Sequence, residues 1–314
     1  MNAPGRSIQV VRDLFRRLFR PSYRPSSRLS PLDPSAGTWM LFPGMAWLLL
    51  FFFAPLGIVL LVSFATRGLY GGVHWSFTLE NYTHLLDAQY VRIYVRSFLL
   101  AAGTTLICLV VGFPLAYYMA RLPARRQLVW LLLVLIPFWT NFLIRTYGLM
   151  FILGTDGVLN TTLVRLGLLR EPIEILYTDL AILIGLVYGY LPFMVLPLYA
   201  VLSRLDLTVV EAARDLYASR PATFWKVIVP LAKPGIVGGS VLVFVPSVGA
   251  YVTPDILGGA RTMMIGNLIQ HEYLVIRDWP LGSAISFVLM VLVVLALAIY
   301  RSSEGVAWKS LARR

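Results

Sequence analysis

The chain alternates between long apolar windows without charged side chains and shorter connections that hold the charges. A helix needs about 20 apolar residues to cross about 30 Å of hydrocarbon, and six windows come close to or exceed that length. They are 34–66, 97–120, 127–144, 180–203, 234–254 and 279–300. The third window extends past Arg145 into 147–153, and a straight helix would carry Arg145 to the outer interface, where its charge can reach water. A place on the translocation pathway is the alternative for Arg145. The pattern predicts an all-α membrane protein with six transmembrane helices.

The distribution of basic residues predicts the orientation of the chain and its division into parts. Most of the 27 lysine and arginine residues lie in the first tail, in 121–126, in 204–233 and after the last window. Because cytoplasmic loops of membrane proteins collect these residues, both termini and the loop 204–233 are predicted to be cytoplasmic. We expect a basic tail at 1–38, a transmembrane domain at 39–302 and a cytoplasmic tail at 303–314. The first tail is either an amphipathic helix on the membrane surface or a mobile segment.

The composition excludes most other classes of protein. Hydrophobic residues make up 58% and charged residues 13% of the 314 residues, whereas soluble domains are about a quarter charged. The basic residues behind the net charge of +12 are therefore expected to interact with membrane lipid and not with nucleic acid. Cys108 is the single cysteine, which excludes a disulfide within the chain and a multi-cysteine metal site, and no metal site is predicted.

The long cytoplasmic loop has a helical pattern of its own. Thr208 and Glu211 have the spacing of a capping box, which predicts a helix that begins at Thr208. Ser219 is in position to cap a second short helix with a proline in its first turn. That helix carries Phe224 and Trp225. Exposed aromatic side chains on a polar loop indicate a protein-docking surface, and the alternative is that they pack back on the helices.

Part of this loop resembles a known motif. Glu211-Ala212-Ala213, followed at the family's distance by Val-Ile-Val-Pro at 227–230, is similar to the EAA loop of binding-protein-dependent ABC importer permeases. The resemblance implies a type I ABC importer permease bundle, the MetI-like fold, whose loop helix seats in a groove of a cytoplasmic ATPase. The residues that it assigns to ATPase coupling are Glu211, Ala212, Ala213, Tyr217, Phe224 and Trp225.

Tyr217 stands where the family motif has a glycine. A left-handed backbone at that position costs a non-glycine residue about 1–2 kcal/mol. We therefore expect the turn to shift to Ala218 and Ser219.

Other segments resemble the spermidine/putrescine branch of that family. They are 77–82, 175–178, 187–199, 249–259, 264–269 and 277–280. The resemblance implies a polyamine importer of the bacterial cytoplasmic (inner) membrane. Ala250 stands where some polyamine permeases carry an acidic residue, so opines or another small cationic or zwitterionic solute are the alternative substrates.

The same resemblance implies the partners of the chain. These are a dimer of ABC ATPase subunits, a second permease subunit and a periplasmic or lipid-anchored solute-binding protein. ATP and Mg would be bound by the ATPase, and this chain is expected to hold no cofactor. The expected docking surface for the binding protein consists of the outer segments 154–179, with a short helix at 158–167, and 258–278.

The fifth window contains residues that interrupt a helix, namely Pro246, Ser247 and Gly249. Broken helices often mark a translocation pathway, and a packing kink is the alternative. Aromatic rings nearby could hold an ammonium ion through cation–π contacts. The pathway candidates are Trp139, Tyr188, Tyr190, Phe193, Ser247 and Tyr251.

No catalytic motif is present in the sequence. It has neither a Gly-x-x-x-x-Gly-Lys-Ser/Thr loop nor a Gly-x-Ser-x-Gly motif, and Val275 replaces the second histidine that a zincin motif starting at His271 needs. The chain is therefore predicted to be a non-catalytic subunit. A secondary transporter or channel is the alternative class, although the six windows contain no Asp, Glu, Lys or His for ion coupling.

Overall fold

The computed structural model describes residues 34–259 and 262–311. The predicted amphipathic stretch of the first tail lies outside the described residues. The chain divides into two compact units, 1–56 and 57–314, and each is described by itself. The described residues of the first unit belong to helix α2 (Pro34–Ser63), whose last residues belong to the second unit together with all other elements.

Helices dominate the second unit. After α2 the elements are, in chain order, β1 (Thr66–Arg67), β2 (Val73–His74), α3 (Glu80–His84), α4 (Ala88–Ala120), α5 (Ala124–Trp139), α6 (Phe142–Leu153), α7 (Val158–Arg165), α8 (Asp179–Leu202), α9 (Leu207–Asp215), α10 (Arg220–Thr223), η1 (Phe224–Ile228), α11 (Val229–Val248), η2 (Pro254–Gly258), α12 (Ile265–His271), η4 (Glu272–Ile276) and α13 (Trp279–Leu311). The η elements are single π-helical turns, and β1 and β2 pair as an antiparallel hairpin.

The prediction of six membrane helices is confirmed. Six helical segments of the described residues are long and apolar enough to cross a membrane. They are Phe42–Ser63, Ala88–Ala120, Phe142–Arg165, Asp179–Leu202, Arg220–Val248 and Trp279–Ala298. The predicted tail at 303–314 continues α13 as a helix as far as Leu311.

The structure divides the predicted third window between two helices. α5 ends at Trp139 and α6 begins at Phe142. Asn141 caps α6, because its Oδ1 accepts the backbone N–H of Leu143 at 2.9 Å, and Pro137 lies in the last turn of α5. The expected single helix through 127–144 is therefore wrong, since a proline and an asparagine cap end one helix and start the next.

The fifth membrane helix begins earlier than the predicted window 234–254. α10, η1 and α11 form one continuous helical segment from Arg220 to Val248. Pro230 lies in the first turn of α11, directly after the π-helical turn η1. Because the helix is already irregular at η1, the missing N–H of Pro230 does not break a regular α-helical hydrogen-bond pattern. The second short helix of the loop is therefore the start of the fifth membrane helix and not a separate element.

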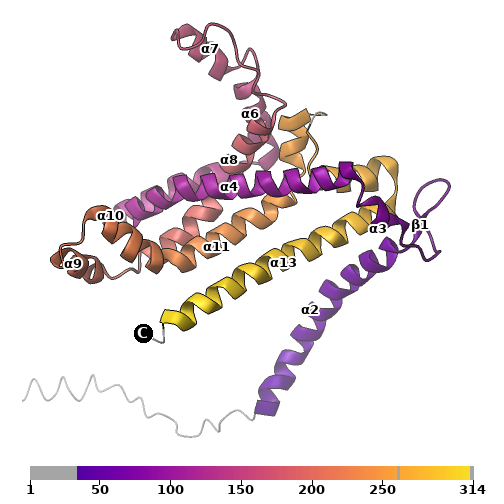
Figure 1. The fold of residues 1–314 in the computed structure, drawn as a ribbon, viewed down its shortest axis with the longest axis horizontal. Coiled ribbons are helices and arrows are strands. Elements are labelled where there is room, and N and C mark those ends of the chain that lie inside the picture. The colour runs from indigo at the N-terminus through magenta and orange to yellow at the C-terminus, as the bar shows by residue number, and fades with distance from the viewer. Residues whose placement is uncertain (1–33, 260–261, 312–314) are drawn as a thin grey trace, which may run out of the picture. The chain divides into compact units, whose positions relative to one another are not determined.

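Helices α4, α8 and α11 pack against one another and enclose the main core of the second unit. Glycine residues of α11 allow it to approach α8 closely. An added Cβ at Gly239 would lie 2.7 Å from the Sδ of Met194, and one at Gly235 would lie 3.0 Å from the carbonyl oxygen of Pro197. Figure 1 shows α9 beyond one end of these helices and the β1–β2 hairpin at the other. These are called the α9 end and the hairpin end.

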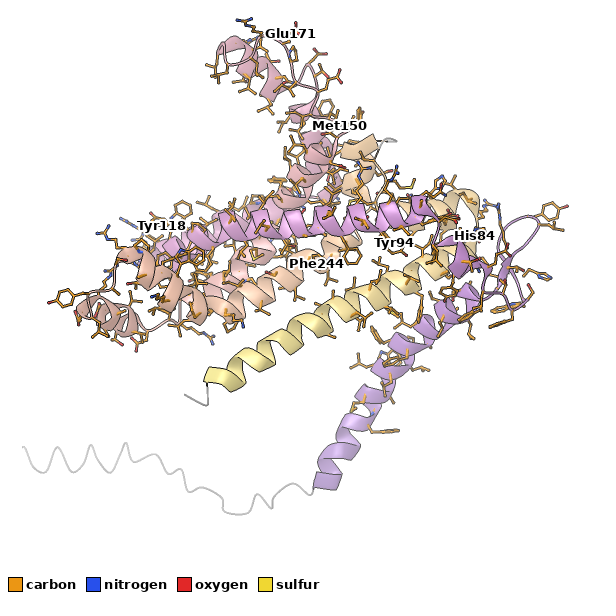
Figure 2. The ribbon with its side chains drawn as sticks, viewed as in Figure 1. His84, Tyr94, Tyr118, Met150, Glu171 and Phe244 are labelled. Carbon is orange, nitrogen blue, oxygen red and sulfur yellow. The ribbon has the colours of Figure 1, made fainter. Side chains whose placement is uncertain are left out.

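At the hairpin end, side chains satisfy the backbone where helices stop. Asn81 is buried, and its Nδ2 donates to the carbonyl oxygens of Ser63 at 2.9 Å and Ala65 at 2.8 Å, just past the end of α2. The hydroxyl of Tyr94 donates to the carbonyl oxygen of Ile285 at 2.8 Å, which joins α4 to α13 (Figure 2). The segment 77–82 thus caps the first membrane helix, which gives a physical role to one of the segments noted in the sequence.

Candidate functional site

Helix α9 begins one residue before the predicted start. Asp206 is the N-cap, and its Oδ1 accepts the backbone N–H of Thr208 at 3.0 Å. Hydrogen bonding to Thr208 lowers the pKa of the Asp206 carboxyl below its ordinary value. The predicted capping box that starts at Thr208 is therefore wrong, because the aspartate two residues earlier takes the cap position.

The Glu-Ala-Ala motif lies on α9, which touches the core with one face only. Val210 is buried and belongs to the main core. Glu211 and Ala212, which follow it, are exposed, and Ala213 is half-buried. The motif therefore presents a carboxylate and a small side chain outward from a helix that is attached to the bundle through its neighbour.

The turn after α9 stays at Tyr217, so the expected shift to Ala218 and Ser219 is wrong. Tyr217 has a φ of 58°, in the left-handed region. Its N–H donates to the carbonyl oxygen of Arg214 at 2.9 Å, and the N–H of Ala218 donates to that of Ala213 at 3.1 Å. These two bonds form a Schellman motif, which satisfies the last carbonyls of α9. The hydrogen bonds keep the turn in place although its central residue is not glycine.

Ser219 caps α10 as predicted, with its Oγ accepting the N–H of Ala222. The two aromatic residues that follow behave differently. Phe224 is half-buried and packs edge-to-face on Phe113 of α4, with ring centroids 5.4 Å apart. Trp225 is 67% exposed. The expectation that both aromatic side chains are exposed is wrong for Phe224, which packs back on the bundle.

The interruption predicted in the fifth window is the end of α11. The helix stops at Val248, and the next helical turn, η2, begins at Pro254. Side chains of other helices bind the backbone on this break and just before it. The hydroxyl of Tyr190 donates to the carbonyl oxygen of Pro246, in the last turn of α11, at 3.3 Å. Between the two helical elements, Nδ2 of Asn267 donates to the carbonyl oxygen of Tyr251 at 2.8 Å, so α12 holds part of the non-helical backbone.

The pathway candidates differ in their exposure. Trp139 is 73%, Tyr251 49% and Tyr188 41% exposed. Tyr190 and Phe193 are half-buried and lie 6.2 Å apart between ring centroids. Ser247 is fully buried, and its hydroxyl donates to the carbonyl oxygen of Val243 at 2.6 Å on its own helix. Of the six, Ser247 therefore offers no free polar group to a solute.

Arg145 lies beside the middle of α8, so its expected place at the outer interface is wrong. Its guanidinium carbon is 5.5 Å from the centre of the Tyr188 ring and 5.4 Å from that of Phe142. Its Nη1 also donates to the carbonyl oxygen of Pro137 at 3.2 Å, near the end of α5. The estimate from a straight helix fails because the chain turns between α5 and α6.

The segment 154–179, which is predicted to lie on the outer side, contains the predicted short helix, α7 (Val158–Arg165). Asn160 is buried and exchanges hydrogen bonds with the backbone of Ile173 at 2.9 and 3.0 Å, which ties the end of the loop to the helix. Within the described ranges no group of three His, Cys, Asp or Glu side chains lies close enough together to hold a metal ion.

Two features of the structure were not predicted from the sequence. They are the β1–β2 hairpin and the burial of the Glu272 carboxyl.

Comparisons with known proteins bear on this arrangement. Residues 112–304 match the family described as the binding-protein-dependent transport system inner membrane component. The chain is 46% identical over 256 residues to the spermidine/putrescine transport system permease protein PotB of Escherichia coli K12, a match that covers 82% of this chain and 93% of that protein.

Two solved structures share the fold. One is of a bacterial ABC transporter involved in the import of the acidic polysaccharide alginate, with a TM-score of 0.65, 17% identity and coverage of 86% of this chain and 97% of that chain. The other is of a bacterial alginate ABC transporter in complex with an alginate pentasaccharide-bound periplasmic protein, with a TM-score of 0.64, 17% identity and coverage of 86% and 96%. At this identity the likeness supports the fold alone.

Proposed function

The chain belongs to the family of binding-protein-dependent transport system inner membrane components, and on that premise we propose that it imports polyamines such as spermidine and putrescine. It is a multi-pass permease subunit of an ABC importer. In the proposal it has both termini in the cytoplasm, forms half of the pathway beside a second permease subunit, and catalyses no reaction itself. ATP and Mg are bound by a dimer of ATPase subunits at the α9 end.

One observation carries the coupling role: α9 exposes Glu211 and Ala212 while Val210 anchors it in the core. A force on the exposed Trp225 reaches α11 directly, because α10, η1 and α11 are continuous. A force on α9 reaches the same segment through the packing of α9 on α10 and η1. α11 in turn ends at the non-helical backbone before η2. Closure of the ATPase dimer would therefore move the α9 end of α11 and change the backbone near Tyr251 at its other end.

The charges near that backbone support a cationic substrate. Asp255 of η2 is exposed, and its N–H donates to the carbonyl oxygen of Tyr251 at 3.0 Å, so a carboxylate and an aromatic ring lie one turn apart. In the proposal, this carboxylate serves a cationic substrate in place of the acidic residue that position 250 lacks. Trp139, Tyr188 and Tyr251 are the exposed rings that could hold an ammonium group in the pathway.

The coupling role is tested with Glu211→Lys in cells that lack the native chain. We expect uptake of labelled putrescine and spermidine to be lost and the ATPase subunit to stop co-purifying, while the variant remains in the membrane. Glu80→Lys is the matched control for co-purification of the ATPase subunit, because Glu80 is an exposed glutamate at the hairpin end and not at the α9 end. Normal uptake by Glu211→Lys would show that α9 does not transmit the coupling.

The substrate is tested by deleting the chain in a cell that has no other polyamine importer. Loss of polyamine uptake, restored by the wild-type chain, supports the proposal. Unchanged polyamine uptake would refute it, and uptake of opines would then be measured with the same strains. Uptake that continues with an ATPase subunit unable to hydrolyse ATP would indicate a secondary transporter or channel instead.

A further inference from the structure

The hairpin after the first membrane helix carries an unusual pair of side chains at its tip. Leu69 is 100% and Tyr70 is 98% exposed, and they are neighbours in a tight turn. Gly71 and Gly72 follow with φ angles of 90° and 79°, which allow the turn to close. These two large side chains, fully in solvent, are a candidate interaction surface, because apolar patches exposed on a protein mark sites of contact with a partner.

The hairpin is held in a fixed position by a distant part of the chain. The N–H of Gly72 donates to the carbonyl oxygen of Arg277 at 2.9 Å, and Nη2 of Arg67 donates to that of Ile276 at 2.7 Å. An added Cβ at Gly71 would lie 2.9 Å from the Cβ of Arg277, so the two backbones are in close contact. The tip is thus presented by a rigid support, as a docking element needs.

The location of the hairpin argues against acyl chains as its partner. It follows the end of α2, and its anchoring residues 276 and 277 precede the first residue of α13. The hairpin therefore lies beyond the ends of both membrane helices that flank it. It is also at the end opposite to α9 (Figure 1), so an ATPase bound at α9 could not reach it.

The surroundings of the tip define the chemistry of a partner. Leu274 and Val275 of η4 are 67% and 66% exposed and extend the apolar surface next to the anchoring turn. Arg67 and Arg277 are exposed and place positive charge beside it. A protein with an apolar depression and an acidic rim would be complementary to this surface.

We propose that the hairpin 66–74 is a docking element for the solute-binding protein, with Leu69 and Tyr70 inserted into that depression. The inference rests on the proposed function only in requiring that the hairpin end faces the binding protein. The hairpin also connects to the pathway. Its anchoring turn ends the α12–η4 segment, and Gly266 of α12 packs so closely on the carbonyl oxygen of Ala250 that no Cβ would fit between them. Docking at the tip therefore acts on a segment that packs on the end of α11.

The test uses the whole importer in lipid nanodiscs and the substrate-loaded solute-binding protein that stimulates ATP hydrolysis by the wild-type complex. Dissociation constants are measured by the anisotropy of the labelled binding protein. We expect Leu69→Ser/Tyr70→Ser to weaken binding at least tenfold, because central apolar side chains dominate such interfaces. Tyr70→Phe should bind as wild type does.

A conservative double variant at the same two positions is the matched control. Leu69 and Tyr70 are 100% and 98% exposed, and Leu69→Met/Tyr70→Phe keeps both side chains large and apolar. Leu69→Met/Tyr70→Phe should leave the dissociation constant of the binding protein unchanged. Wild-type affinity in the hairpin variant, or an equal loss in both double variants, would overturn the proposal.

A second measurement covers the case in which the hairpin variant fails to assemble. A photo-crosslinking residue is placed at position 70 or at position 217 of the otherwise wild-type chain. We expect an adduct with the binding protein from position 70 only. Adducts with lipid alone from position 70 would refute docking. The binding protein is chosen because it stimulates ATP hydrolysis by the importer, and not for its substrate. If the polyamine assignment is wrong, the polyamine uptake experiment fails, but the binding and crosslinking results are unaffected.

Discussion

Replacing Tyr217 with glycine should stabilise the end of α9. Tyr217 holds a φ of 58°, and its side chain is 99% exposed. The substitution therefore removes the left-handed strain of a side chain without removing any buried contact. The two backbone hydrogen bonds of the turn, from Tyr217 to Arg214 and from Ala218 to Ala213, need no side chain and remain.

The magnitude follows from two opposing effects. A left-handed conformation costs a non-glycine residue about 1–2 kcal/mol. Glycine loses more conformational freedom on folding, which costs about 0.5–1 kcal/mol. At the midpoints of these two ranges the net gain is about 0.75 kcal/mol, which corresponds to roughly a two- to fivefold change in an opening equilibrium.

Hydrogen exchange followed by mass spectrometry measures this opening on peptides that contain the last turn of α9. We expect protection of the amides of residues 217 and 218 to increase two- to fivefold in Tyr217→Gly. Tyr217→Ala is the control, since it keeps a Cβ and hence the strain, and it should show no gain. Equal protection in the alanine and glycine variants would refute strain as the cause.

Three further changes have expected outcomes. Asn81→Leu leaves two carbonyl oxygens at the end of α2 without their donor and should lower the free energy of unfolding by about 2 kcal/mol, measured by thermal unfolding in detergent. Burial is the largest cause that raises the pKa of Glu272, so the folded state binds its proton more tightly. Stability should then fall as the pH rises from the ordinary carboxyl value through the raised pKa, and a series of melting temperatures should lose this slope in Glu272→Gln. Asp206→Ala removes the cap of α9 and should speed exchange of the Thr208 amide, whereas Asp206→Asn should not; because the pKa of Asp206 is lowered, the wild-type protection should be lost only as the pH falls through that lowered value.

The membrane helices could be predicted because their signal is local. In hydrocarbon every backbone group must be paired within the segment, so length and apolarity alone identify a spanning helix. The cap at Ser219 could be predicted because it depends on residues only three positions apart. The Glu-Ala-Ala motif could be found because its residues are adjacent in the sequence.

Other features depended on partners far away in the chain. Phe224 and Trp225 are adjacent aromatic residues, and only the presence of Phe113 on α4 decides that the first packs inward and the second stays exposed. Arg145 is beside Tyr188 because the chain breaks between α5 and α6, which no helical periodicity shows. The hairpin owes its position to Arg67 bonding a carbonyl 209 residues later. The sequence by itself determined the number of membrane helices and the Glu-Ala-Ala motif. Packing between distant segments decided where the third and fifth helices begin and which side chains stay exposed for a partner, because exposure depends on the whole fold.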